Sequence, residues 1–108
     1  MPATPESAKT SLDQRLRDHA ATRWPQLSGL RVRHKGGFAY IHGELGAGEV
    51  IPLMRLRYTG SAAHWGVALH LASTGKYENT ILPAGGFAGT PEEALDCACG
   101  LYLTTENP

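Results

Sequence analysis

The stretch Leu30-Arg-Val-Arg-His-Lys-Gly-Gly-Phe-Ala-Tyr-Ile-His42 contains two alternating runs joined by Gly36-Gly37. Two adjacent glycines between such runs predict a two-residue hairpin turn, because primed turns need positive φ angles. In that register the facing pairs are Lys35 with Phe38, Arg33 with Tyr40 and Arg31 with His42, and side-chain alternation puts all six on one face. The other face, which is the better core face, carries Leu30, Val32, His34, Ala39 and Ile41.

Three more strands are predicted after this hairpin. The third is Val50–Tyr58, with Met54, Leu56 and Tyr58 on one face and Leu53, Arg55 and Arg57 on the other. Pro52 lacks an N–H, so we expect it near the start of that strand or at a bulge. The fourth strand is Trp65–Ala72, whose Trp65 face is strongly apolar, and a weaker fifth is Lys76–Leu82. The loops are 43–49, 59–64, 73–75 and 83–89.

One helix is predicted before the strands in the sequence and one after them. Ser11-Leu-Asp-Gln14 has the form of a capping box, and the apolar stripe of Leu12, Leu16, Ala20 and Trp24 follows it. Pro25 ends this helix near Arg23 or Trp24. The second helix opens at Thr90-Pro-Glu-Glu93, a cap followed by acids suited to the helix dipole. Its buried face is expected to hold Ala94, Leu95, Ala98, Leu101 and Tyr102, with Asp96 and Gly100 facing away.

This order of elements lacks any βαβ unit, which favours the α+β class. We expect a four- to five-stranded antiparallel meander sheet with the N-terminal and C-terminal helices packed on one face. Residues 11–103 form the single domain, 1–10 a disordered lead and 104–108 a short tail. A chain of 108 residues is long enough to fold as one domain.

Composition points to a cytoplasmic protein that has no membrane partner. No apolar stretch reaches the about 18 residues of a membrane span, and the N-terminus lacks the pattern of a signal peptide. Cys97 and Cys99 are two residues apart, about 200° around a helix, which suits neither a disulfide nor shared metal ligation. Their thiols are expected to stay reduced.

The net charge of zero hides an asymmetry between the halves of the chain. Residues 1–58 carry nine Lys/Arg and five acids, whereas residues 59–108 carry one Lys and five acids. Such a split is typical of a face that binds polyanions, and equally of a dipole without a role.

Catalytic and metal sites find little support in the pattern. The five histidines show no metal spacing, no phosphate loop of the GxxxxGK[ST] type occurs, and no cofactor is expected. Cys97 and Cys99 follow Asp96 late in their helix, where the dipole raises a thiol pKa, so they are interpreted as small apolar fillers. We predict a non-enzymatic protein, and a small cysteine-dependent enzyme stands as the third alternative.

Basic residues interleaved with aromatic ones are the remaining signal. Cations that meet phosphates and rings that stack on bases are what a nucleic-acid platform on a sheet uses. The candidate DNA- or RNA-binding residues are Arg31, Arg33, Lys35, Tyr40 and His42, extended by Arg55 and Arg57. A solvated outer sheet face protected against edge pairing has the same pattern, so both interpretations stay open.

An alternative function is a protein–protein adaptor or homodimeric accessory protein. Trp65, Phe87 and Tyr102 would supply its aromatic anchors, since such side chains dominate interface hot spots. Phe87 stands in a loop of small residues, where it either contacts a partner or folds back over the core.

Three blocks of the chain, Pro52–Ser61, Trp65–Ala68 and Gly89–Leu103, resemble a group of small actinobacterial proteins to which no activity is assigned. Thr90–Leu95 is also similar to the Thr-x-Glu-Glu-Ala-Leu helix of HicB-type antitoxins. Arg55-Leu-Arg-Tyr58, Trp65-Gly66 and Glu92-Glu-Ala94 follow the order found in plant ethylene-response-factor DNA-binding domains. That resemblance implies DNA contacts from Arg55, Arg57 and Trp65, although this chain has fewer basic residues on those strands.

Overall fold

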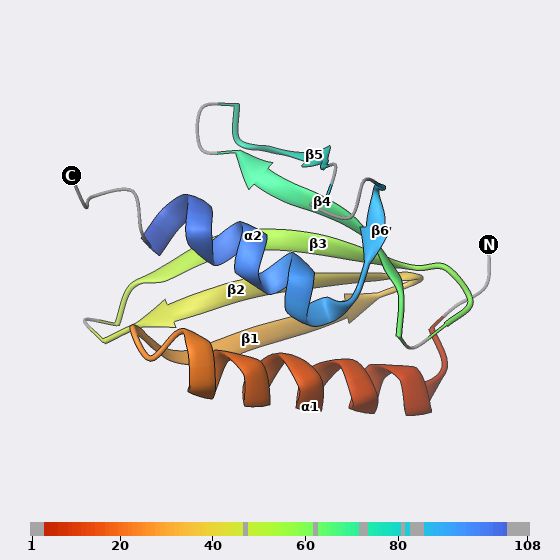
Figure 1. Cartoon of the computed structure of the whole chain (residues 1–108), viewed down its shortest axis with the longest axis horizontal. Helices are drawn as coiled ribbons and strands as arrows, with labels where there is room; N and C mark the ends of the chain where they lie inside the picture. Colours follow the sequence, from red (N-terminus) through yellow and green to blue (C-terminus); the bar gives the residue numbers. More distant parts are fainter. Residues whose placement is uncertain are drawn as a thin grey trace.

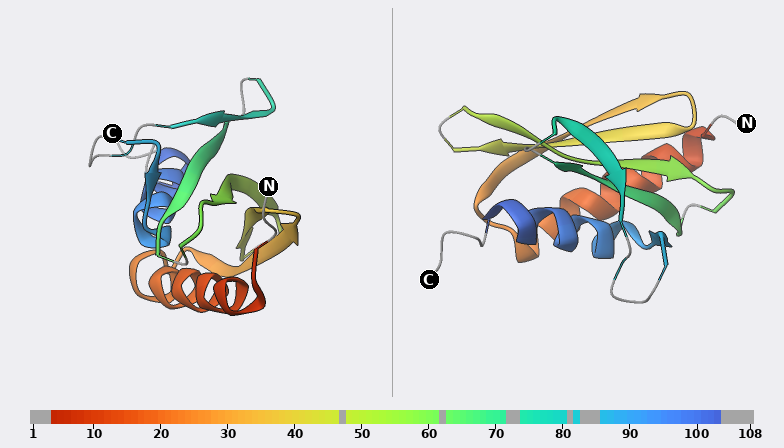
Figure 2. Two further views of the ribbon diagram at one scale, coloured as in Figure 1. Left: turned by 90° about the vertical axis from the view of Figure 1, so that its right-hand side faces the viewer. Right: turned by 90° about the horizontal axis from the view of Figure 1, so that it is seen from above.

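The computed structural model describes residues 4–46, 48–61, 63–71, 74–80, 82 and 86–103. Residues 101–103 are described through their backbone alone. The elements are α1 (Glu6–Arg23), β1 (Leu27–Lys35), β2 (Phe38–Leu45), β3 (Val50–Tyr58), β4 (Trp65–Leu71), β5 (Lys76–Asn79), β6 (Ala88–Gly89) and α2 (Pro91–Leu103). One antiparallel sheet runs in the order β1-β2-β3-β4-β5, with β6 also paired to β4. Both helices lie on the same side of this curved sheet (Figures 1 and 2). The predicted α+β meander is confirmed.

Helix α1 begins earlier than the sequence pattern predicted. It starts at Glu6 after Pro5, whose backbone is extended and whose carbonyl accepts from Lys9 N at 3.0 Å. The prediction of a capping box at Ser11 is therefore wrong, since Ser11 lies inside the helix. Ala8 is buried one turn before the predicted apolar stripe, which explains why the helix extends to the N-terminal side.

The expected lead 1–10 is corrected accordingly. Residues 6–10 are helical, and Thr4 is buried. Residues 1–3 and the expected tail 104–108 lie outside the described residues. The C-terminal end of α1 is as predicted: the last helical residue is Arg23, and Trp24 N still donates to Ala20 O before Pro25.

The β1–β2 hairpin has the predicted register. Lys35 pairs with Phe38, and the pairing continues without a shift to Leu30 and Gly43. Gly36 adopts a φ of 60°, the left-handed conformation that a tight turn requires and that glycine takes at no steric cost. Ala39 and Ile41 are fully buried, so the predicted core face is the one packed under the helices.

A β-bulge in β3 changes which residues face the core. Ile41 pairs with Met54 and His42 pairs with Pro52, so Leu53 has no partner on β2. Both Leu53 and Met54 are fully buried. The prediction that Leu53 shares the face of Arg55 is wrong, because the extra residue of a bulge breaks strict alternation. The prediction that Pro52 lies near the start of this strand or at a bulge is confirmed, since Pro52 is the third residue of β3 and directly precedes Leu53.

Strand β4 lies between β3 and two short strands that cover its other edge one after the other. Thr80 N donates to Val67 O, and Val67 N donates to Phe87 O at 2.8 Å. Pairing on this edge therefore passes from β5 to β6 at Val67. The fifth strand ends at Asn79 rather than at Leu82, and β6 lies in the segment expected as loop.

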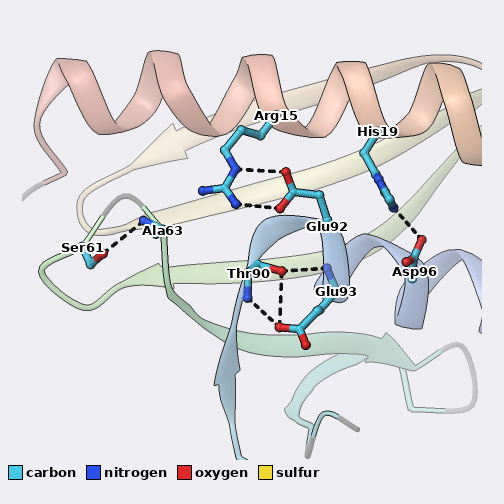
Figure 3. A network of polar contacts seen from close by, with 8 residues as sticks. All are labelled: Arg15, His19, Ser61, Ala63, Thr90, Glu92, Glu93 and Asp96. Atoms are coloured by element: carbon cyan, nitrogen blue, oxygen red, sulfur yellow. Dashed lines mark hydrogen bonds and ion pairs between the residues drawn. The ribbon is translucent and has the colours of Figure 1, made fainter. Parts of the chain in front are cut away.

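Helix α2 begins with the cap that the sequence indicates. Glu93 N donates to Thr90 Oγ1 at 3.1 Å, and Thr90 N donates to Glu93 Oε1 at 2.9 Å (Figure 3). This reciprocal pair is a complete capping box. The helix buries Ala94, Leu95, Ala98 and Cys99 against α1 and the sheet. The side chains of Leu101 and Tyr102, expected on this face, lie outside the described residues.

Candidate functional site

The sheet face turned away from the helices, which we call the outer face, brings together most of the predicted binding residues. Strand pairing and alternation place on it Arg31, Arg33 and Lys35 from β1, Phe38, Tyr40 and His42 from β2, Arg55 and Arg57 from β3, Gly66, Ala68 and His70 from β4, and Tyr77 and Asn79 from β5. Positions from five strands thus form one continuous surface.

Cations on the outer face have few carboxylate partners. Arg31 forms an ion pair with Glu44, which also lies on β2. Among the described residues, Arg33, Lys35 and Arg57 make no ion pair, and all three side chains are exposed. The outer face is therefore positively charged and accessible to an anion.

An aromatic cluster covers the middle of the outer face. The guanidinium carbon of Arg55 lies 4.8 Å from the ring centroid of Phe38 and 5.6 Å from that of Tyr77. The ring of Tyr77 also contacts that of Tyr40 in an edge-on arrangement, with 5.6 Å between the ring centroids. These contacts hold Arg55 half-buried between two rings, and cation–π attraction favours that position.

Tyr77 and Asn79 were not among the predicted site residues. Alternation in β5 puts both on the outer face, where Tyr77 pairs with His70 and Asn79 with Ala68. The available signal was the pair Gly66 and Ala68 on the outward face of β4, because residues this small leave room for side chains from neighbouring strands.

His42 contributes less charge than its position indicates. Burial lowers the pKa of His42 below its ordinary value, and repulsion from His70 and Arg31 lowers that pKa further. A lowered pKa favours the neutral ring at pH 7. His42 therefore offers hydrogen bonds rather than a full positive charge.

Trp65 does not belong to this surface. Its side chain is fully buried on the helix side of the sheet, where its ring centroid lies 5.4 Å from that of Tyr58. The predicted contact between Trp65 and nucleic acid is therefore corrected. Alternation puts Trp65 on the face of Val67 and Leu69, and that face forms the core.

A hollow of about 380 Å³ opens on the outer face beside the aromatic cluster. Its walls are formed by Phe38, Arg55, Arg57, Gly66, Val67, Ala68, Asn79 and Phe87. Phe87 is 55% exposed, so it does not fold back over the core. The backbone hydrogen bond from Val67 N holds Phe87 at this place.

On the opposite side of the sheet, acids and bases of the two helices pair with one another (Figure 3). Arg15 donates two hydrogen bonds to Glu92, at 2.9 and 2.8 Å. Asp96 accepts from His19 Nε2 at 2.8 Å and from Trp24 Nε1 at 2.9 Å. The expectation that Asp96 faces away is wrong, because α1 supplies both of these donors.

These contacts change the meaning of the charge asymmetry along the chain. Partial burial would raise the pKa of Glu92, but the hydrogen bonds and the charge of Arg15 outweigh it, so the pKa is lowered. Glu92, an acid of the second half, is thus paired with Arg15, a base of the first half, within the helix layer. On the outer face, by contrast, Arg33, Lys35 and Arg57 make no ion pair with any described residue.

Neither cysteine has the surroundings of a nucleophile. Burial, together with the nearby Asp96 carboxylate, raises the pKa of Cys99 to about 12. Burial also raises the pKa of Cys97, and Asp96 and Glu93 add to that effect. Both thiols are therefore protonated at neutral pH, whereas thiolate chemistry needs a lowered pKa.

The described part of the chain contains neither a metal-ligating cluster nor a membrane-spanning helix. No group of three or more His, Cys, Asp or Glu side chains in that part is arranged to hold a metal ion. None of its helices is long and apolar enough to cross a membrane.

Comparison of the chain with protein-family models, with curated proteins and with solved structures finds no match. The geometry of the outer face is therefore the basis on which a function is proposed.

Proposed function

We propose that this protein is a non-enzymatic module that binds nucleic acid through the outer face of its sheet. The observation that carries the proposal is the group of exposed cations without carboxylate partners, Arg33, Lys35 and Arg57, around a half-exposed aromatic cluster. Phosphates release counterions when they meet such cations, and this release supplies most of the affinity of nonspecific binding.

The distribution of charge supports the orientation of such a complex. Glu92 and Asp96 belong to the helix layer, on the far side of the sheet, and are occupied by Arg15, His19 and Trp24. The one described carboxylate among the outward strand positions, Glu44, pairs with Arg31. Phosphates on the outer face would thus meet little repulsion.

Aromatic side chains support nucleic acid over an arbitrary polyanion. Rings and guanidinium planes stack on bases, and such stacking tolerates any sequence because every base has a π-face. Tyr40 and Phe38 stand half-exposed between the cations of β1 and those of β3. A simple anion site would gain nothing from these rings.

Fluorescence polarisation with labelled DNA and RNA at low ionic strength tests the proposal. We expect the logarithm of the affinity to fall linearly with the logarithm of the salt concentration. Arg33→Gln and Arg57→Gln should each weaken binding and reduce that slope by about 1, the change expected for one lost phosphate contact.

The matched control is Arg23→Gln, which removes the same charge from an exposed position in the last turn of α1. It should leave both the affinity and the salt slope unchanged. Absence of binding at tens of micromolar protein, or an equal effect of all three variants, would contradict the proposal.

The second candidate, an adaptor or homodimer, now rests on Phe87. Of its three expected anchors, Trp65 is buried and the side chain of Tyr102 is outside the described residues, whereas Phe87 is 55% exposed. Sedimentation equilibrium over a wide concentration range distinguishes this candidate. A monomer at every concentration would argue against self-association, and a dimer that Phe87→Ala dissociates would favour it.

A cysteine-dependent enzyme is the third and weakest candidate, because burial raises both thiol pKa values. Free Cys97 and Cys99 suit a reducing compartment, and we propose the cytoplasm as the place where the protein acts.

A further inference from the structure

The hollow on the outer face has the size and the kinds of side chain that suit one flat unit of an anionic ligand. Its volume of about 380 Å³ lies in the lower part of the range of about 300–1,000 Å³ found for small-molecule sites. Aromatic rings, guanidinium groups and one carboxamide share the walls. A sheet face that is merely exposed to solvent does not require these groups to surround a concave space.

The floor of the hollow exists because β4 presents only Gly66 and Ala68 to this part of the outer face. Gly66 has no side chain, and Ala68, only 3% exposed, has a single methyl group. A Cβ built at Gly66 would lie 3.5 Å from the Arg57 side chain, an ordinary contact. A side chain at position 66 would therefore fit the strand but would take up space that is open in this protein.

Groups around the floor are held in place before any ligand arrives. Phe38 and Tyr77 clamp the guanidinium of Arg55 between their rings. The hydrogen bond from Val67 N at 2.8 Å anchors the backbone of Phe87, while its ring stays exposed. Preorganisation of this kind lowers the ordering cost of binding.

We propose that this hollow takes one unstacked base of a single-stranded nucleic acid, an inference that rests on the proposed function and specifies its substrate. Phe87 stacks on the base, the Asn79 carboxamide meets the polar edge of the base, and Arg57 contacts a neighbouring phosphate. Bases inside a duplex are paired and stacked, so they cannot enter the hollow without being extruded. The protein therefore prefers single strands to duplexes.

The test compares oligothymidylate and oligouridylate of about twelve nucleotides with the duplex formed by oligothymidylate and oligoadenylate. The measurement is polarisation at low salt with wild-type protein, Phe87→Ala, Gly66→Val and the control Val50→Ala. Val50 is the other exposed large apolar side chain and lies outside the hollow. Thermal unfolding of each variant checks that it is folded.

We expect the wild-type protein to bind at least one of the single strands about ten-fold or more tightly than the duplex. Phe87→Ala should weaken single-strand binding by at least about five-fold, the lower end of the effect of losing one stacked base. Gly66→Val should do the same by filling the floor, with the salt slope unchanged because every cation remains. Val50→Ala should bind like the wild type.

Failure of this inference is distinguishable from failure of the proposed function. Equal affinity for single strand and duplex, or unchanged binding by Phe87→Ala and Gly66→Val while Arg33→Gln weakens it, would overturn the hollow as a base site and leave the outer face as a phosphate-binding surface. Absence of binding to every oligonucleotide would overturn both.

Discussion

The two faces of the sheet are built by alternating residues of the same strands, yet their charged and titratable side chains differ. The one on the core face of the hairpin is paired, and most cations of the outer face form no ion pair with any described residue. On the core face His34, the one charged or titratable residue of that face of the hairpin, contacts Asp13 of α1 at 3.2 Å. On the outer face Arg33, Lys35 and Arg57 remain exposed and unpaired within the described part of the chain. The core face thus provides stability, and the outer face keeps its charges available.

The largest expected effect tests the assignment of Trp65 to the core face. Trp65→Ala should lower the free energy of unfolding by about 3–5 kcal/mol, because it removes a fully buried aromatic side chain and leaves a cavity. Urea unfolding followed by circular dichroism measures this loss. Phe87→Ala on the outer face should change it by less than about 0.5 kcal/mol. Similar losses for the two variants would refute the division between the faces.

A smaller loss of stability is expected where the helix layer uses its charges. Asp96→Ala should cost about 1–3 kcal/mol, because it leaves the buried Trp24 indole N–H without its acceptor and removes a contact to His19. Asp96→Asn keeps an acceptor oxygen and should cost less. The comparison variant is Asp18→Ala, which loses only an exposed contact to Gln14. An unfolding free energy of Asp96→Ala equal to that of Asp18→Ala would show that the network contributes nothing.

The two cysteines of α2 should behave as parts of the hydrophobic core. Iodoacetamide at neutral pH should react slowly with native protein and fast after unfolding, because burial raises both thiol pKa values and that of Cys99 to about 12. Cys99→Ala should cost about 1 kcal/mol of stability and leave the proposed binding to nucleic acid unchanged. A native thiol whose alkylation rate titrates below pH 7 would instead support the enzyme candidate.

The smallest expected effect concerns His42 on the outer face. Burial, His70 and Arg31 lower its pKa, so the folded protein binds this proton less readily than the unfolded chain does. Stability from this group is therefore present above pH 6.5 and declines as the pH falls from there toward the folded pKa. A titration of ring proton shifts by NMR should show a midpoint below 6.5, and Arg31→Gln should move it upward. A midpoint that Arg31→Gln does not move would mean that Arg31 has no effect on this group.

Local signals predicted those parts of the fold that depend on neighbouring residues. Gly36-Gly37 determined the hairpin register, and Thr90 with Glu93 determined where α2 begins. Pro25 placed the end of α1 correctly. The start of α1 was missed because the Ser11–Gln14 pattern resembles a capping box as closely as Thr90–Glu93 does. Ala8 is buried by tertiary contacts, and this burial extends the helix to the N-terminal side of Ser11.

The candidate site was predicted in part for the same reason. Alternation placed Arg31, Arg33, Lys35, Tyr40, His42, Arg55 and Arg57 on one face, as the strand pairing confirms. The hollow was not predictable, because Phe87 directly precedes β6, a strand of two residues whose pairing with β4 holds Phe87 at the hollow. The ring centroids of Tyr77 on β5 and Tyr40 on β2 lie 5.6 Å apart. This contact between non-adjacent strands cannot be predicted from any periodicity in the sequence.

The sequence by itself thus determined the α+β class, the order of the main strands and the alternation that separates arginines from the core, because each depends on turn chemistry or on a period of two. The tertiary structure alone decided that Leu53 turns inward at a bulge, that Asp96 joins the two helices, and that Trp65 is buried while Phe87 is exposed. These outcomes depend on which surfaces meet after the sheet has curved around its core. A residue's type and spacing do not carry that information, since the same side chain is stable in the core or at the surface according to what packs against it.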